Sequence, residues 1–449
     1  MSVTAASLRQ SGSYQLRNNS VSAVLRPKNV RELLACLSDT APYSAPFRPV
    51  GAGSSSTDCN TASSGTLIDL TALDEVVHID AYNDSVVVQA GIRIGVLANR
   101  LARQGLELAG SYELMDRTIG GAIASGCIGA GIANDGAFLA SHVVAMSVVT
   151  PSGQVAKISD RNKQMLNAYR LSYGMLGIIY EVTLKVRPIA TFEATHKRCT
   201  IKQFSAATES LARSRIGIKF YLMPFRDRVY LDLRRYNAES TTRKLPWKFK
   251  EWGESTVLPH VFKSIGRIVP VAGARYRIID EISKATQQIV NNRLVRSGSS
   301  IASSSLRKSN PYQYTTWLFP AADFAIVAQT YTEFCREIHK KTGFRCDMPT
   351  VGFGLAADQS AWLSPSFDEP MFALRAVSTQ KEGWENFVLD FAEFAEHWGG
   401  SPFYNQTRGL TPDHSNAVFG ERLQMFRRVR RQLDPDNRFM NPFLSQYFL

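Results

Sequence analysis

The sequence predicts an α+β protein of two or three domains. The first reason is the length of 449 residues, which is too long for one ordinary hydrophobic core. The second is a composition of 44% apolar and 20% charged residues, which is typical of folded globular chains and not of disordered ones. The third is the order of patterns along the chain, because short strand-like and helix-like segments alternate in its first part.

The first of these segments lead into a loop rich in glycine and serine. Residues 21–25 alternate like a strand, Pro27 breaks the pattern, and residues 30–37 have helical spacing. A short strand over residues 47–50 then runs directly into the sequence Gly-Ala-Gly-Ser-Ser-Ser at residues 51–56. A strand that opens into such a loop is typical of a phosphate-binding site.

The loop over residues 51–56 is a candidate anion cradle. Glycines permit the positive φ angles that turn several backbone N–H groups toward one point, and serine hydroxyls add further donors. It is neither a Rossmann loop nor a P-loop, because Ser56 stands where G-x-G-x-x-G has its last glycine and no G-K-[ST] follows. Taken alone, the loop is equally compatible with an ordinary tight turn.

A second glycine-rich run follows a predicted strand over residues 85–90 and a predicted helix over residues 94–104. Residues 118–131 read Thr-Ile-Gly-Gly-Ala-Ile-Ala-Ser-Gly-Cys-Ile-Gly-Ala-Gly. So many positions without a side chain cost folding entropy and add little packing, which makes sense where backbone approaches a large ligand closely. A third element, residues 173–186, is a glycine turn that enters an alternating strand.

These motifs, in this order and spacing, resemble the flavin domain of the vanillyl-alcohol oxidase and p-cresol methylhydroxylase superfamily. The sequence S-H-V-V-A-M-S-V-V-T-P-S-G at residues 141–153 adds to the resemblance. Near the C-terminus, H-W-G-G at residues 397–400 and L-D-P-D-N-R-F-M-N-P at residues 433–442 are similar to the ends of aldonolactone oxidases and of decaprenylphosphoryl-ribose oxidase.

The resemblance implies an α+β fold with a two-subdomain FAD-binding domain of the p-cresol methylhydroxylase (PCMH) type and an inserted antiparallel sheet that forms a substrate, or cap, domain. We expect the FAD domain over residues 1–190 and the cap over residues 191–400, with a basic insertion at residues 243–308. Residues 401–449 are expected to return to the FAD domain.

The resemblance also places FAD along the three glycine-containing segments. The residues that it assigns to the cofactor are Gly51, Ala52, Gly53, Ser54, Ser55 and Ser56 at the pyrophosphate, Thr118, Gly120, Gly121, Ser125 and Gly126 along the flavin and phosphates, and Gly177, Ile178 and Ile179 beside the adenine. Many relatives attach FAD covalently through a histidine at the position of Ser54, so we expect non-covalent FAD. The position of Cys127 suits a close backbone approach better than a covalent link.

The expected activity is hydride transfer from a CH–OH donor to the flavin, which oxygen or a quinone-like acceptor then reoxidises. For the donor's proton, or for orienting the donor, the candidates are His397, Tyr404 and Gln406, and each is equally compatible with a packing role. Gly400 replaces the lysine of the H-W-G-K motif, and no Glu-x-Arg is found in residues 351–355, so we expect a donor less polar than a sugar lactone. Alternatives are a flavin enzyme that acts on C–C or C–N bonds and a non-catalytic, membrane-associated binding protein of the same fold.

The formal charge of +13 is concentrated in the basic insertion. Residues 243–308 contain thirteen Lys or Arg against four acids, mixed with tryptophan, phenylalanine and aliphatic side chains. Contact with an anionic membrane surface is one interpretation and a solvated helical face is the other. We do not expect nucleic-acid binding, because no helix-turn-helix, zinc-finger or RNP-like pattern accompanies the charge.

Location and metal binding are predicted from what the sequence lacks. The first 17 residues have no signal-peptide pattern and no segment has the large apolar residues of a membrane span, so we expect a cytoplasmic protein, with a peripheral place on the inner face of a membrane as the alternative. The six cysteines are scattered, with no C-x-x-C pair, so neither a metal site nor a disulfide framework is expected.

Overall fold

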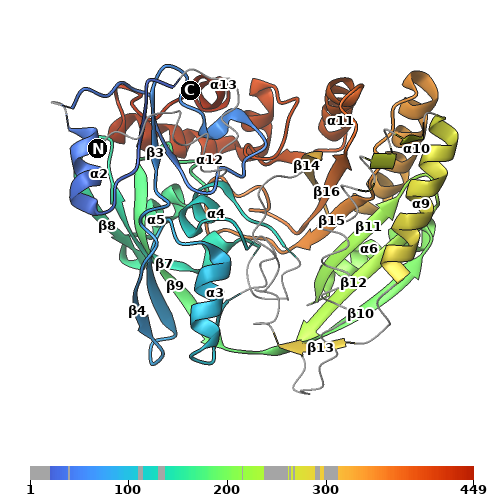
Figure 1. The fold of residues 1–449 in the computed structure, drawn as a ribbon, viewed down its shortest axis with the longest axis horizontal. Coiled ribbons are helices and arrows are strands. Elements are labelled where there is room, and N and C mark those ends of the chain that lie inside the picture. The colour runs from blue at the N-terminus through green and yellow to red at the C-terminus, as the bar shows by residue number, and fades with distance from the viewer. Residues whose placement is uncertain are drawn as a thin grey trace.

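The computed structural model describes residues 21–38, 41–109, 115–129, 137–214, 216–236, 261, 264–265, 268–269, 271–288, 294–297 and 312–449. They form two parts that lie side by side, with the N-terminal part on the left of Figure 1 and a second, large sheet with its helices on the right. No helix within these residues is long and apolar enough to cross a bilayer.

The smallest sheet belongs to the N-terminal part and has parallel strands in the order β1-β3-β2. Its strands are β1 (Ala23–Leu25), β2 (Phe47–Val50) and β3 (Thr66–Asp69). Helix α2 (Val30–Leu37) begins after Asn29, whose side chain caps the first turn, and its buried Leu33 and Leu37 pack on this sheet. The predicted helix over residues 30–37 is confirmed.

The second sheet of the N-terminal part is antiparallel, in the order β4-β5-β9-β7-β8, with β6 paired to β9. Its strands are β4 (Val76–Asp80), β5 (Ser85–Gln89), β6 (Leu106–Leu108), β7 (Val143–Val149), β8 (Val155–Ser159) and β9 (Ile178–Pro188). Its helices are α3 (Ile94–Ala102), α4 (Ile119–Ser125) and α5 (Lys163–Tyr169). Strand β9 buries Val182 and Leu184 completely, while Lys185 is exposed, which is the alternation of a half-buried strand.

The large sheet, which we call the cap sheet, has the order β13-β10-β12-β11-β15-β16-β14-β17. Its strands are β10 (Thr191–Cys199), β11 (Gly217–Met223), β12 (Arg228–Tyr236), β13 (Leu294–Ser297), β14 (Gln313–Pro320), β15 (Thr350–Leu355), β16 (Met371–Ser378) and β17 (Ser401–Pro402). All the pairings between its neighbouring strands are antiparallel.

Helices cover one face of the cap sheet and the N-terminal part covers the other (Figure 1). The helices are α6 (Ile201–Arg213), α10 (Phe324–Thr342) and α11 (Trp384–His397), and α9 (Ala272–Gln288) lies beside α10. Phe324 stacks on Phe372 of β16 at 4.5 Å between ring centroids, within the core on the helix side. On the opposite face, Phe353 and Ala373 belong to the core of the N-terminal part, so this face looks toward α4.

The last segment of the chain returns to the N-terminal part. Helices α12 (Pro412–Leu433) and α13 (Pro442–Phe448) lie next to the first strands, although they come from the opposite end of the chain (Figure 1). The side-chain amide of Asn441 donates to the backbone oxygens of Asp58 and Thr61 at 2.9 and 2.8 Å. The chain thus has an α+β fold in which two small subdomains support one face of an antiparallel cap sheet.

We propose that the domains divide at residues 190 and 400. The N-terminal sheet ends with β9 at Pro188, and the cap sheet begins with β10 at Thr191. Most of the insertion over residues 243–308, with the basic and tryptophan residues that the sequence singled out there, lies outside the described residues, apart from α9, β13 and a few isolated positions.

Candidate cofactor and substrate site

The loop after β2, residues 51–57, is held from the C-terminal segment. The backbone N–H of Ser56 donates to the backbone oxygen of Asn405 at 2.9 Å. The hydroxyl of Thr57 donates to the backbone oxygen of Tyr404. Gly53 has φ +64°, a left-handed conformation that favours glycine. A loop that the sequence presents as a local strand-to-turn motif is therefore fixed by residues almost 350 positions away.

The start of helix α4 lies against this loop. Thr118 caps the helix and accepts a hydrogen bond from the N–H of Gly121 at 3.3 Å. A Cβ on Gly51 would lie 1.9 Å from the Thr118 hydroxyl oxygen, so glycine is required where the two segments touch. The two glycine-rich motifs of the sequence are thus brought together.

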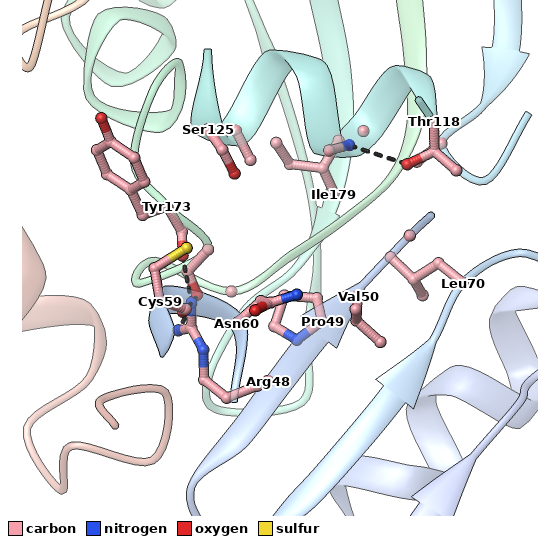
Figure 2. Close-up of a pocket in the computed structure, with 17 residues that line it drawn as sticks. Arg48, Pro49, Val50, Cys59, Asn60, Leu70, Thr118, Ser125, Tyr173 and Ile179 are labelled. Carbon is pink, nitrogen blue, oxygen red and sulfur yellow. Dashed lines mark hydrogen bonds between the residues drawn. The ribbon is translucent and has the colours of Figure 1, made fainter. Parts of the chain in front are cut away.

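A cavity with an empty volume of about 530 Å³, part of it open to solvent, lies between these segments. Figure 2 shows Arg48, Pro49 and Val50 of β2 on one side of it and Thr118 and Ser125 of the α4 region on the other. Seven of the residues predicted to bind the cofactor line it: Gly51, Thr118, Gly120, Gly121, Ser125, Gly177 and Ile179.

The other predicted cofactor residues lie beside the cavity and do not line it. Ala52, Gly53, Ser54, Ser55 and Ser56 continue the loop from Gly51, and Ser54 is exposed. Ile178 is buried in the core between α2 and the small sheet. Gly126 has φ +81° and packs against the Phe403 ring, where a Cβ would lie 3.0 Å from its nearest atom.

Sequence reasoning missed several lining residues, chief among them Arg48, Asn60 and Tyr173. Arg48 is only 2% exposed, which is unusual for an arginine. An arginine within the strand that precedes the glycine loop was the one signal that could have found it. Asn60, in the short helix after the loop, and Tyr173, in a turn, reach the cavity only through the tertiary fold.

The residues of the cavity fit a dinucleotide. A Cβ at Gly121 would have only the Thr118 hydroxyl oxygen within 4 Å, at 3.0 Å, so internal packing does not require glycine there. Gly121 is exposed toward the cavity, and hydroxyls of Thr118 and Ser125 line the same space. Open glycine backbone and neutral hydroxyl donors are the groups that surround a pyrophosphate.

A second polar cluster lies on the face of the cap sheet that looks toward α4. Arg375 of β16 donates through Nε to the Thr316 hydroxyl at 3.1 Å and through Nη2 to the Gln406 side-chain oxygen at 2.8 Å. Its guanidinium lies over the Tyr314 ring at 5.2 Å. Burial lowers the pKa of Arg375, Tyr314 raises it, and the nearby Arg117 lowers it.

Gln406, predicted from sequence, is fully buried in this cluster. Its side-chain oxygen is used by Arg375, while its side-chain nitrogen has no hydrogen-bond partner among the described residues. Its backbone N–H donates to the Phe403 oxygen at 2.8 Å, and Phe403 packs on Gly126 at the end of α4. Gln406 is therefore connected to both the cap sheet and the glycine-rich segment.

The other two candidates lie elsewhere. Tyr404 is fully buried, shares a hydrogen bond with the Ser415 hydroxyl at 2.5 Å, and packs on Tyr173 and Phe448. Burial raises its pKa well above the usual range of a tyrosine, so the phenolate is disfavoured. His397 is exposed at the C-terminal end of α11, on the helix-covered side of the cap, and its ring is edge-on to Trp398.

Comparison with known proteins identifies the family. A model of the FAD binding domain matches residues 21–159, and a model of D-arabinono-1,4-lactone oxidase matches residues 182–447, which is more than half of the chain. The chain belongs to the D-arabinono-1,4-lactone oxidase family. The predicted superfamily and the FAD cofactor are thereby confirmed, and the protein is an FAD-dependent oxidoreductase that acts on a CH–OH donor.

Its similarity to individual relatives is low but extends along the chain. It is 22% identical to an L-gulono-1,4-lactone dehydrogenase of Mycobacterium tuberculosis, over 94% of this chain and 95% of that protein. It is 26% identical to an L-gulonolactone oxidase of Bos taurus, over 49% of this chain and 50% of that protein. Among solved structures, cholesterol oxidase from B. sterolicum has the same fold, with a TM-score of 0.77 at 14% identity over 95% of this chain and 94% of that one.

Proposed function

We propose that this protein oxidises a CH–OH group of a small polyhydroxylated donor of the aldonolactone type, with FAD bound non-covalently. The observation that carries the proposal is that Gly51 and Gly121, from two distant glycine-rich motifs, line one cavity within a family of lactone oxidases. The relatives with 22% identity over most of the chain are named as gulonolactone enzymes, which supports the same class of donor.

A feature of the cap sheet supports a more polar donor than the sequence motifs led us to expect. The sequence motifs that grip polyols in relatives are replaced here, and this predicted a largely apolar site. Arg375 supplies a cation from β16, opposite Val351 of β15 in the pairing of the two strands. A polar donor therefore has hydrogen-bonding partners on this face.

The contacts suggest a role for each group of residues. Residues 51–56, 118–126 and 177–179 hold the cofactor, whose flavin ring supplies the acceptor for the two electrons of the C–H bond. Arg375 and Gln406 orient an oxygen substituent of the donor with their N–H groups. Tyr404 acts as a positioning residue, because its hydrogen bond with Ser415 fixes the segment that carries Gln406. Burial raises the pKa of its phenol, so Tyr404 keeps its proton.

Non-covalent binding is proposed from the side chains near the cavity. Ser54 stands at the position where relatives carry an attaching histidine, and a serine hydroxyl is a much weaker nucleophile than an imidazole at neutral pH. Cys127 is fully buried behind Gly126. Acid precipitation of the yellow protein should release all of the flavin into the supernatant, and flavin retained in the pellet would exclude the proposal.

The electron acceptor is proposed to be oxygen or a quinone. After reduction by donor, the reoxidation of the flavin would be followed under air and under nitrogen with a soluble quinone. Reoxidation by neither acceptor would refute this part of the proposal.

We further propose a cytoplasmic protein that contacts an anionic membrane surface through residues 243–308. Ile268 and Val271 of this segment are 76% and 64% exposed, and the exposed Arg277 and Lys284 follow on α9, where Lys284 pairs with Glu281. Exposed apolar residues among cations are typical of peripheral membrane surfaces.

An anaerobic titration tests the oxidoreductase function directly. D-arabinono-1,4-lactone, L-gulono-1,4-lactone and an apolar secondary alcohol would each be mixed with the FAD-loaded protein, and the flavin absorbance would be recorded. Bleaching by a lactone is the expected result. A protein that binds FAD but is bleached by none of a broad set of alcohols and lactones would instead support the non-catalytic binding protein.

A further inference from the structure

Among the described residues, the cluster around Arg375 contains two arginines and no carboxylate that pairs with them. Arg375 and Arg117 are close enough for Arg117 to lower the pKa of Arg375. Neither arginine forms an ion pair with a carboxylate among the described residues, and their hydrogen bonds there go to neutral acceptors: Thr316, Gln406 and the backbone oxygen of Gly126. Two neighbouring, partly desolvated cations repel each other, and an anion that binds between or beside them would remove this cost.

The position of the cluster favours a donor group as that anion. Arg375, Tyr314 and Phe353 share the face of the cap sheet that looks toward α4, and Gln406 is joined through Phe403 to Gly126 at the end of that helix. The phosphate-cradle residues Thr118 and Gly121 lie at the other end of α4. Arg117 directly precedes Thr118, but its guanidinium donates to the backbone oxygen of Gly126 at 3.3 Å. The charged groups of the cluster therefore lie at the Gly126 end of α4, beside the cap sheet.

The side-chain amide of Gln406 offers a further, neutral hydrogen-bond donor next to Arg375. The side-chain nitrogen of Gln406 is fully buried and has no partner among the described residues, while the Gln406 oxygen is fixed by Arg375. A buried N–H group without an acceptor destabilises a protein, so such a group is typically retained where a ligand completes the hydrogen bond. An anionic oxygen that accepts from both Arg375 and Gln406 would satisfy the guanidinium and the amide together.

We propose that Arg375 and Gln406 bind an anionic oxygen group of the donor, a carboxylate or a phosphate, next to the CH–OH group that is oxidised. This inference rests on the proposed function and extends its substrate class from neutral lactones to polyhydroxylated donors that carry such a group, namely open-chain hydroxy acids or sugar phosphates. Arg375 is the specificity-determining residue, since its guanidinium provides the charge. The Gln406 amide adds a neutral donor that fixes the orientation of the group.

The test compares three donors of similar size: D-arabinono-1,4-lactone, which is neutral, sodium D-arabinonate, which has a carboxylate, and D-arabinose 5-phosphate. Anaerobic flavin reduction gives kcat and KM for wild type, Arg375→Gln and Arg375→Lys. In wild type, one anionic donor should have a higher kcat/KM than the lactone. In Arg375→Gln the ratio of anionic to neutral kcat/KM should fall by about 10- to 100-fold, mainly through KM, and Arg375→Lys should recover part of it.

The matched control is Arg336→Gln. Arg336 is exposed on α10, on the other side of the cap sheet, and donates to the backbone oxygen of Pro224. The substitution Arg336→Gln removes the same charge from the same domain and should leave the ratio of anionic to neutral kcat/KM unchanged. The two anionic donors distinguish carboxylate from phosphate recognition, because the kcat/KM of the donor that the site prefers should decrease more in Arg375→Gln.

Two results would overturn the inference. One is a wild-type preference for the neutral lactone. The other is an equal decrease of kcat/KM for all three donors in Arg375→Gln, which would mean that the guanidinium acts through the flavin and not through an anionic group of the donor. Calorimetric titration of the FAD-loaded protein with sodium D-arabinonate and with D-arabinose 5-phosphate separates this failure from that of the proposed function. Binding that weakens about 10-fold or more in Arg375→Gln, with no flavin reduction by any donor, would sustain the anion site and refute the oxidation.

Discussion

The guanidinium of Arg48 donates a hydrogen bond of 2.6 Å to the backbone oxygen of Phe439, which is 391 residues further along the chain. The same side chain donates to the backbone oxygens of Cys59 at 2.8 Å, Gly174 at 3.3 Å and Tyr173. Burial lowers the pKa of Arg48 to about 10, so the group remains charged at neutral pH. One arginine therefore joins the strand before the phosphate loop to η1 (Asp58–Asn60), to the turn before β9 and to the C-terminal segment.

Replacing Arg48 by methionine should destabilise the protein and weaken FAD binding. The substitution removes one donor from four backbone oxygens, and each buried acceptor that is left unsatisfied costs about 1 to 3 kcal/mol. Urea unfolding of the apoprotein and FAD titration would measure the two effects. Arg161→Met, at an exposed arginine of η3 (Asp160–Asn162), is the control and should change stability by no more than about 0.5 kcal/mol. A wild-type midpoint for Arg48→Met would show that the network does not stabilise the fold.

Two adjacent glycines should respond differently to alanine. In Gly120→Ala the new Cβ would lie 2.8 Å from the Ala90 Cβ, so the apoprotein should lose roughly 1 to 3 kcal/mol of stability through overpacking. In Gly121→Ala the Cβ would lie 3.0 Å from the Thr118 hydroxyl oxygen alone, and the roughly 1 kcal/mol by which alanine favours a helix offsets this close contact, so the stability should change less than in Gly120→Ala.

The FAD affinity of Gly121→Ala should nevertheless fall by about 10-fold or more, because the methyl group occupies the space where the cofactor approaches the backbone. Thermal melting of the apoprotein and titration with FAD measure the two quantities separately. If Gly121→Ala binds FAD as tightly as wild type, the cofactor does not approach α4 at this position.

The cofactor cradle could be predicted from sequence largely because its signals are local. Positive φ angles and close backbone approach select glycine at single positions, so the loops at Gly51 and Gly121 are visible as motifs before any tertiary contact is known. The same holds for helix α2, where apolar spacing and a capping asparagine act within a few residues.

Arg375 could not be predicted from sequence, because its role depends on which strands pair. Its strand is joined to β14 and β15, which are separated from it in the chain by about 55 and 20 residues, and only this register places it near Tyr314 and Gln406. The motif position of His397 was equally uninformative, because the exposure of a residue at a helix end is decided by what packs against that end.

Replacing Tyr404 by phenylalanine should preserve flavin reduction. The phenol loses one buried hydrogen bond, to Ser415, which should lower stability by about 1 kcal/mol. Because burial raises the pKa of this tyrosine, the phenolate is not available as a base near neutral pH, and the pH profile of kcat/KM should keep its shape.

Ser415→Ala removes the same hydrogen bond from its other end and serves as the control for stability. A decrease in kcat of more than about 100-fold in Tyr404→Phe, with kcat unchanged in Ser415→Ala, would assign the donor's proton to Tyr404 after all.

Membrane contact is best tested with point substitutions, because deletion of residues 243–308 would damage the cap. That segment includes β13, which pairs with β10, and α9, whose Ile279 is 1% exposed. The double variant Ile268→Asp, Val271→Asp instead places charges on side chains that already face solvent, so the fold should be kept.

Sedimentation of this double variant with vesicles of phosphatidylserine and phosphatidylcholine should show at least a 10-fold weaker association than that of wild type. Burying even part of two such side chains contributes more than about 1.4 kcal/mol, which corresponds to a factor of ten. The control variant Ile326→Asp, Leu389→Asp changes two residues of α10 and α11 that are 48% and 56% exposed, and it should bind like wild type. Equal binding of both double variants would leave residues 243–308 as a solvated face of the cap. The same conclusion would follow if wild type bound equally well to phosphatidylcholine alone, because an anionic surface attracts each nearby Lys or Arg by about 1 kcal/mol.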